Sequence, residues 1–460
     1  MYSIILTMLH MLKKYYISGA TIVNEGKSYV GNVLIDNGFI VDIHEGITDS
    51  PGDAIVIDGS GHYLIPGVID DQVHFRDPGL THKGDLYTES RAAVAGGVTS
   101  FMDMPNTVPN TLTQELLEEK YSAAASKSLA NYSFYMGVSN DNLDEVLKTD
   151  RSKVCGIKVF LGASTGNMLV DNVQTLENLF KQSKSLIAVH CEDEPIIRGN
   201  LQYFRQQYGD DIPPQVHPLI RSREACLKSS TLAVELASKY NTRLHVLHLS
   251  TADEMDIFTT EPSDSKKRIT AEVCVHHLWF SDDDYTRLGN SIKWNPAIKT
   301  DADRNALMQA LHDNRIDVIA TDHAPHTSDE KQNPYLSCPS GGPLVQHSLV
   351  AMLEKVNNRE IGLELVVDKM CHAPASIFGV DRRGYIRIGY HADLVLINPD
   401  QPWEVNKENI LYKCGWSPFE GVTFHSKVTH TFVGGHLAWN NGVFDESRKG
   451  SRLLFNHDDE

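Results

Sequence analysis

The chain has 460 residues, of which 41% are hydrophobic and 22% are charged, a composition typical of a globular protein rather than a disordered one. It carries 42 Lys and Arg against 60 Asp and Glu, so its formal net charge is −18. Such an acidic chain is poorly suited to binding nucleic acid or an anionic membrane through its net charge. We therefore expect neither partner, and the length allows one barrel-sized domain plus a smaller one.

The N-terminal residues and the cysteines indicate the cellular compartment in which the protein is expected. Met1–Leu12 is apolar but has no basic leading region and no small-residue cleavage site, so we do not interpret it as a signal peptide. Met11 is an alternative start, and no apolar run reaches the roughly 18 residues of a membrane helix. The seven cysteines are scattered singly without a CxxC pair. They indicate free thiols in a reducing compartment, and we expect a cytoplasmic protein.

The two ends of the chain share a pattern of short apolar strands punctuated by Gly and Asn. In residues 1–65 and 384–460 the predicted strands are Tyr15–Val23, Ser28–Ile35, Ile40–His44, Ala54–Asp58, Ala392–Ile397, Val428–Val433 and His436–Trp439. Because chain ends often lie close together, we expect both ends to form one small β-sandwich domain.

Residues 66–383 alternate apolar strand-like runs with helical patterns such as Thr88–Ala95, Thr113–Ala125 and Ser229–Tyr240. The eight runs are Leu64–His74, Val98–Met104, Tyr132–Val138, Gly156–Leu161, Leu186–Cys191, Leu244–Leu249, Thr270–Val275 and Val318–Asp322. Strand–helix alternation implies parallel βαβ units, and eight of them predict an α/β fold of the TIM-like (β/α)8 barrel type. A doubly wound open sheet is the alternative.

Polar side chains end most of these runs, where the strands of a parallel barrel meet on one face. They are Gln72, His74 and Arg76 at the first run, Asn106 after the second, Lys158 in the fourth, His190 in the fifth, His248 in the sixth, His276 and His277 after the seventh, and Asp322, His323 and His326 at the eighth. Taken singly, each has an ordinary explanation, such as a hydrogen-bonded loop His, a snorkelling Lys or a helix N-cap. Together they predict metal chemistry.

At these residues the chain resembles the amidohydrolase superfamily and, within it, the class I dihydroorotases. The resemblance runs nearly from end to end. The motifs that carry it are Pro66–Asp70 leading into His74–Gly79 (HFRDPG), Gly96–Thr99, Met104–Thr107 (MPNT), Lys158, His190, His248, Glu272 with His276 and His277, Trp294–Pro296, Thr321–His326 and Gly389–Asp393. The HFRDPG and MPNT stretches are the specific ones, because hydantoinases and allantoinases share the metal positions.

The resemblance implies divalent cations, usually zinc, at the mouth of the barrel. It assigns His190 and His248 to one ion, His74 and Asp322 to the other, and a carboxylated Lys158 to the bridge between them. The chain departs from the family pattern at Gln72, which replaces the first His of an H-x-H motif. Since an amide oxygen is a poor zinc ligand, we expect one or two zinc ions with a weakened first site.

The function implied by this resemblance is the reversible cyclisation of N-carbamoyl-L-aspartate to L-dihydroorotate, a step of pyrimidine biosynthesis. A zinc-activated hydroxide would attack the cyclic amide, and Asp322 would carry the proton as the catalytic residue. The carboxylate of the substrate would meet the guanidinium of Arg76. The other expected substrate contacts are Asn106, Asn295, His326, Ser340 and Gly341, and the polar segment 327–343 could cover the substrate.

Two other functions stay open at this point. The first is a different cyclic amidohydrolase, such as a hydantoinase or allantoinase, against which Arg76 and the MPNT stretch argue. The second is a catalytically inactive subunit, for which Gln72 is the only support, that scaffolds another enzyme such as aspartate transcarbamoylase. A homodimer is a further expected form, and the only other partner expected is the small-molecule substrate.

Overall fold

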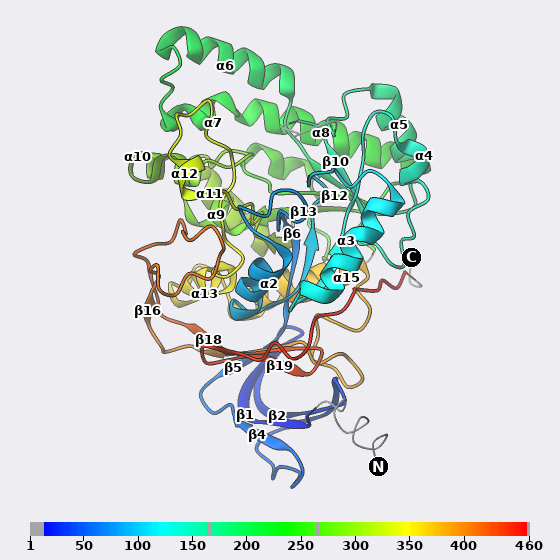
Figure 1. Ribbon diagram of the computed structural model, residues 1–460, viewed down its shortest axis with the longest axis vertical. Coiled ribbons are helices and arrows are strands. Elements are labelled where there is room, and N and C mark those ends of the chain that lie inside the picture. The colour runs from blue at the N-terminus through cyan, green and yellow to red at the C-terminus, as the bar shows by residue number, and fades with distance from the viewer. Residues whose placement is uncertain (1–12, 163–167, 264–265, 458–460) are drawn as a thin grey trace.

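The computed structural model describes residues 13–162, 168–263 and 266–457 (Figure 1). Met1–Leu12, on which the alternative start was predicted, lies outside these described residues. No helix in the described part of the chain is long and apolar enough to cross a membrane. The seven cysteines all fall within it and are free thiols, six of them buried, in agreement with the expectation from their spacing.

One continuous sheet of nine strands takes its strands from both ends of the chain. Its strands are β1 (Tyr15–Asn24), β2 (Lys27–Asp36), β3 (Phe39–Glu45), β4 (Ile55–Asp58), β5 (Tyr63–Pro66), β15 (Leu394–Asn398), β18 (Lys427–Val433), β19 (His436–Asn440) and β20 (Val443–Phe444). The order is β20-β19-β18-β15-β5-β1-β2-β3, with β4 paired to β1. The two ends join at β5, which is parallel to β1 and antiparallel to β15.

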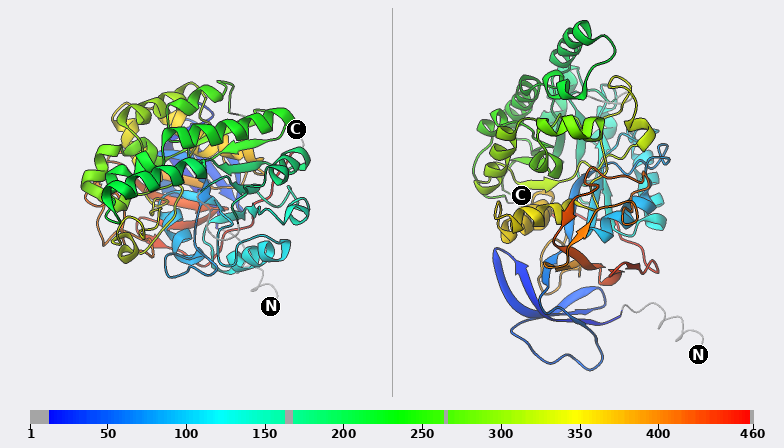
Figure 2. Two further views of the ribbon diagram at one scale, coloured as in Figure 1. Left: turned by 90° about the horizontal axis from the view of Figure 1, so that it is seen from above. Right: turned by 90° about the vertical axis from the view of Figure 1, so that its left-hand side faces the viewer.

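A small hydrophobic core stabilises this end sheet, which lies below the rest of the molecule in Figure 1 and in the right-hand view of Figure 2. Ile17, Val33 and Ile35 from the start of the chain pack in one cluster with Leu394 and Phe432 from its end, and none of them is exposed. Segments far apart in the sequence therefore share one core. The exact domain boundaries, at 65/66 and at 383/384, stay a prediction.

The middle of the chain contains the parallel strands that the sequence predicts. They are β6 (Val68–Val73), β7 (Val98–Asp103), β8 (Asn131–Phe134), β9 (Met136–Gly137), β10 (Ile157–Phe160), β11 (Ile187–His190), β12 (Leu244–Val246), β13 (Ile269–Cys274) and β14 (Val318–Ala320). They form a three-stranded sheet, β6-β7-β8, and a six-stranded sheet, β14-β13-β12-β11-β10-β9. Every pair is parallel.

The order of these strands follows the sequence without the reversal that a doubly wound sheet requires. The two sheets adjoin at both seams. Only Tyr135 separates β8 from β9, and an isolated parallel bridge joins Val73 to His323, with the His74 N–H donating to the His323 carbonyl at 2.7 Å. The structure therefore confirms an α/β fold of parallel strands in two adjoining sheets, and their closure into one (β/α)8 barrel stays a prediction.

Helices flank the parallel strands, as the view from above in Figure 2 shows. The α-helices are α2 (Leu86–Ala95), α3 (Gln114–Lys127), α4 (Leu143–Val146), α5 (Val173–Gln182), α6 (Glu194–Tyr208), α7 (His217–Ile220), α8 (Arg223–Tyr240), α9 (Val275–Trp279), α10 (Tyr285–Leu288), α11 (Asp301–His312), α12 (Ser328–Lys331), α13 (Ser348–Asn357), α14 (Leu363–Val367) and α15 (Ala373–Phe378). Helix α8 begins six residues before the predicted Ser229, because the Ser222 side chain caps it by accepting from the Ala225 N–H.

Candidate active site

A cavity of about 630 Å³ lies at the carboxyl ends of the parallel strands, and every site residue predicted from the sequence lines it. These are His74, Arg76, Asn106, Lys158, His190, His248, Asn295, Asp322, His326, Ser340 and Gly341. Gln72 and Lys83 line it as well. Asp322 is the single acidic residue of the lining, whereas Arg76, Lys83 and Lys158 are basic. The cavity is thus locally cationic in a strongly acidic protein, which favours an anionic ligand.

Three residues of the cavity have left-handed backbone conformations. The φ angles are 67° at Arg76, 40° at His248 and 47° at Asp322, and each residue follows closely after a strand. Residues other than glycine rarely adopt positive φ, and when they do so the surrounding structure must hold them there. This concentration of backbone strain marks the cavity as a functional site.

His74 and Asp322 form the first half of the predicted metal site. His74 Nε2 lies 3.1 Å from Asp322 Oδ1, while His74 Nδ1 contacts Asn106 Oδ1 at 2.7 Å. Gln72 Nε2 donates to Asp322 Oδ1 at 3.3 Å. Gln72 therefore helps to orient the carboxylate of Asp322 through its side-chain amide N–H group.

The chemistry of this pair fits a bound cation. If His74 Nδ1 carries the proton that Asn106 accepts, Nε2 of the neutral ring has a lone pair. That lone pair faces the carboxylate of Asp322, so two acceptors lie 3.1 Å apart. A proton or a metal ion between them relieves this repulsion, and an imidazole nitrogen with a carboxylate oxygen is a common ligand pair for zinc.

His190 and His248 form the second half. His190 Nδ1 lies 2.9 Å from His248 Nε2, and His190 Nε2 contacts Glu192 Oε2 at 3.0 Å. Glu192 in turn accepts from Arg221. A His held by a carboxylate through its other ring nitrogen is the arrangement that orients metal-ligating imidazoles. Burial lowers the pKa of both His190 and His248, which keeps them in the neutral form that binds metals.

Lys158 lies on β10 and is 1% exposed. Its Nζ makes no hydrogen bond within the described residues and lies 4.6 Å from the centroid of the Phe160 ring. Burial lowers its pKa to about 7, although Asp322 and Glu272 oppose that effect. A buried amine without a partner needs a further group, which fits the predicted bridging role.

Arg76 and His326 occupy the cationic part of the cavity. Arg76 Nε donates to the Pro325 carbonyl at 3.1 Å, and its Nη2 lies 3.0 Å from His326 Nε2. His326 Nδ1 lies 3.0 Å from Lys83 Nζ. Burial lowers the pKa of His326 far below its usual value, and Arg76 and Lys83 lower it further, so this ring is neutral. No carboxylate pairs with Arg76 in the described part of the chain.

A buried triad of Asp71, His245 and Glu272 lies on β6, β12 and β13, and sequence inspection did not predict it. His245 Nε2 lies 3.0 Å from Asp71 Oδ2 and 3.7 Å from Glu272 Oε2, and all three side chains are fully buried. Glu272 Oε1 accepts the backbone N–H of His248 at 2.9 Å. The triad therefore supports the left-handed backbone of His248. The only sequence signal was an unusual number of charges within apolar strands.

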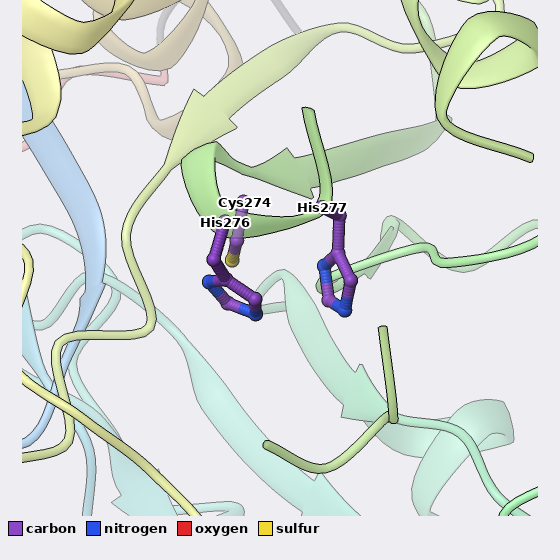
Figure 3. Close-up of side chains that lie close together, drawn as sticks. All are labelled: Cys274, His276 and His277. Carbon is purple, nitrogen blue, oxygen red and sulfur yellow. The ribbon is translucent and has the colours of Figure 1, made fainter. Parts of the chain in front are cut away.

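Cys274, His276 and His277 form a second buried group of ligand atoms at the end of β13, shown in Figure 3. Both ring nitrogens of His276 lack a hydrogen-bond partner in the described residues. However, the two imidazole centroids are 4.1 Å apart, and His276 stacks on Trp294 at 4.5 Å. The ligand atoms of the three residues lie within 4.8 Å of one another, so the group could hold a metal ion, but none of the three lines the cavity.

Comparisons with known proteins agree with this chemistry. Residues 229–438 match the model of the amidohydrolase family. A protein of Methanosphaera stadtmanae named dihydroorotase is 32% identical over 91% of this chain and 95% of its own length. A Halobacterium salinarum protein of the same name is 34% identical over 84% of this chain and 89% of its own length.

Solved structures share the fold. L-hydantoinase (dihydropyrimidinase) from Arthrobacter aurescens superposes with a TM-score of 0.91 over 97% of this chain and 100% of its own, at 24% identity. Dihydropyrimidinase from Brevibacillus agri superposes with a TM-score of 0.86 over 96% of this chain and 100% of its own, at 25% identity. These likenesses support the architecture, with its parallel strands and its separate sheet.

Proposed function

Since this chain belongs to the dihydroorotase family and is a cyclic amidohydrolase, we propose that it interconverts N-carbamoyl-L-aspartate and L-dihydroorotate as a class I member. The observation that carries the proposal is Arg76. This residue is only 7% exposed, and its guanidinium contacts a carbonyl and a neutral ring and lines a cavity without pairing with a carboxylate of the described residues. A buried cation requires a counter-charge, and the ring carboxylate of dihydroorotate supplies one.

Burial lowers the pKa of Arg76 only to about 10, so the guanidinium stays charged at neutral pH. Its planar fork can bind a carboxylate through two parallel hydrogen bonds. We assign Asn106, Asn295 and His326 to the remaining polar contacts with the substrate. The side-chain oxygen of Asn295 is buried without a partner in the described residues, so it can accept from a ring N–H.

Ser340 and Gly341 are assigned to backbone contacts. The Gly341 N–H donates to the Lys293 carbonyl at 2.8 Å, and the Ser340 carbonyl points the opposite way, 3.0 Å from His326 Nε2. A planar trans peptide requires this opposition. The Pro339 carbonyl also points away from the cavity, toward Lys331, so the Ser340 N–H is directed to the cavity side. That N–H can therefore supplement Arg76 in binding the anion.

Asp322 is assigned to proton transfer. His74 and Gln72 both contact its Oδ1, so Oδ2 is the oxygen that we expect to take the proton of water and deliver it to the leaving ring nitrogen. In the direction of ring closure the same oxygen removes the proton from the ureido nitrogen. We propose that zinc is held by His74, Asp322, His190 and His248. When bound, it would supply Lewis acidity that polarises the amide carbonyl and acidifies water.

We propose that Lys158 bridges the ions after its amine has reacted with carbon dioxide. Only a neutral amine reacts in this way, and burial of Lys158 supports that form. Gln72 gives no nitrogen ligand, so the His74 half should bind its ion more weakly than the His190 half. The domain boundaries, the cytoplasmic location, a homodimer and association with aspartate transcarbamoylase remain predictions alongside this function.

The second candidate function is hydantoin or dihydropyrimidine hydrolysis, which the names of the solved structures favour. A panel of dihydroorotate, carbamoyl aspartate, 5,6-dihydrouracil and hydantoin, assayed with and without added zinc, tests both. We expect turnover of the first pair to exceed that of the uncharged rings by at least about a hundredfold, the value of one buried charge pair. Preference for the uncharged rings would refute the proposal, and zinc-loaded protein without turnover would support the inactive subunit.

A further inference from the structure

One wall of the cavity is formed by the end of a short irregular segment, residues 335–341. Pro339, Ser340 and Gly341 line the cavity directly. The sequence predicts a long covering loop over 327–343, and the structure interrupts that loop with helix α12. The backbone N–H groups of Ser337 and Cys338 donate to the Pro334 carbonyl, and that of Gly341 donates to the Lys293 carbonyl. The carbonyls of the segment are left to other donors.

Two buried ammonium groups hold this wall from behind. Lys331 Nζ donates to the carbonyls of Pro339 at 2.9 Å and Gly341 at 2.8 Å, and lies 3.3 Å from the carbonyl of Lys293. Lys293 Nζ donates to the carbonyls of Tyr335 at 2.7 Å and Cys338 at 2.5 Å. The two lysines are only 6% and 7% exposed.

Neither lysine makes an ion pair with a carboxylate of the described residues. Glu330, which adjoins Lys331, pairs with Lys83 at 2.8 Å instead. Backbone carbonyls therefore provide the solvation that water gives to an exposed ammonium. Burial lowers the pKa of Lys331 to about 7 and that of Lys293 to about 8, but the amine donates N–H groups in either protonation state. A buried donor that contacts several carbonyls of one segment favours the single conformation in which all of them converge.

The carbonyl contacts of Lys331 also affect which backbone groups of residues 339–341 face the cavity. The carbonyls of Pro339 and Gly341 point to Lys331. The N–H of the peptide between them donates to the Lys293 carbonyl, so the Ser340 carbonyl of that peptide points toward His326. His326 in turn contacts Arg76. Lys331 therefore acts on the substrate pocket through the backbone, although it does not line the cavity itself.

We propose that Lys331, supported by Lys293, is a positioning residue that fixes the anion-binding wall of the site. The expected effect on substrate binding rests on the proposed function. The expected effect on the conformation of the wall rests only on the contacts described above. Without the ammonium, the carbonyls lose their donor and the Pro339–Gly341 peptides reorient. Binding of an anionic substrate should weaken, while the metal ligands and Asp322, which lie on the strand ends, should be unaffected.

The test compares Lys331→Met, which keeps the length of the side chain without donors, with Lys331→Gln, which keeps donors without charge. We expect Lys331→Met to raise KM for dihydroorotate by at least about tenfold, the loss of a charged hydrogen bond, with kcat within about threefold. Lys331→Gln should fall between Lys331→Met and the unmodified enzyme. Lys239→Met, which removes an exposed lysine on α8, is the matched control and should change neither constant.

Hydrogen exchange and zinc content make the test independent of the substrate. In Lys331→Met the hydrogen-bonded amides of Ser337, Cys338 and Gly341 should exchange at least about tenfold faster, while zinc content and the protection of β10–β12 stay unchanged. Unchanged exchange at this wall would overturn the proposal, as would equal losses in kcat and in zinc. If the unmodified protein does not turn over dihydroorotate, the proposed function fails, and the exchange result still decides the role of Lys331.

Discussion

Replacing Arg76 by Ala tests the assignment of the substrate carboxylate most directly. The guanidinium is buried, has no acidic partner among the described residues, and faces the cavity. In Arg76→Ala a bound carboxylate would enter the same desolvated space without its counter-charge. Truncating one partner of a buried charge pair costs about 3 kcal/mol, which corresponds to a loss of about 150-fold in kcat/KM.

The assay compares dihydroorotate with 5,6-dihydrouracil, which has the same ring without the carboxylate. We expect Arg76→Ala to lower kcat/KM about 150-fold for dihydroorotate but less than about fivefold for dihydrouracil, since only the first substrate loses a charge pair. Arg198→Ala is the matched control, because the Arg198 side chain on α6 is 69% exposed and pairs only with Glu194. Neither substrate should be affected by it.

The comparison separates binding from structural damage. Arg76 also donates to the Pro325 carbonyl, and loss of that bond should cost about 1 kcal/mol of stability, measurable by urea unfolding. Equal losses of kcat/KM for both substrates would mean that Arg76 supports the fold of the site rather than the carboxylate. An unchanged kcat/KM for dihydroorotate would refute the reasoning altogether.

Three further predictions concern the metal, the fold and pH. Gln72→His adds an imidazole beside Asp322, so it should retain more zinc after dialysis against a chelator, and an unchanged zinc-to-protein ratio would contradict the weakened first site. Asp393→Ala breaks a buried ion pair with Arg383 and should lower the free energy of unfolding by about 3 kcal/mol in urea, whereas a loss below 1 kcal/mol would contradict the importance of that pair. Burial lowers the pKa of His245, but its two carboxylate partners raise it to about 9, so the stabilisation is complete below pH 6.5 and is lost as pH rises toward 9. Unfolding of His245→Phe should lack this part of the pH dependence.

Much of the architecture could be predicted because its signals are local. Runs such as Leu186–Cys191 alternate with helical patterns, and the structure places β11 inside that run. The first residues of helices were harder to predict from the sequence, because the N-cap of α8 at Ser222 precedes any apolar periodicity. The alternation also predicted that the parallel strands close into a barrel, but it could not reveal that the contact between the first and last strands is a single bridge between Val73 and His323.

The site was predicted through its polar strand ends, and most of their side chains line one cavity, whereas His276 and His277 pack beside it and His323 contacts Glu89 at 2.9 Å. What the sequence could not reveal is how these residues are held. Gln72 looked only like a missing ligand, whereas its amide contacts Asp322. The triad around His245 and the carbonyl contacts of Lys331 depend on partners far along the chain. Such interactions have no local spacing rule, because tertiary contact alone creates them.

The position of β5 at the centre of the end sheet has a consequence for synthesis on the ribosome. One edge of β5 pairs with β1, which emerges earlier in the same N-terminal segment, and the other pairs with β15, which emerges only after the whole parallel-strand region. Until then the nascent chain carries an open strand edge next to apolar side chains. Chaperone binding should therefore concentrate on the early strands, and it should end when translation delivers β15.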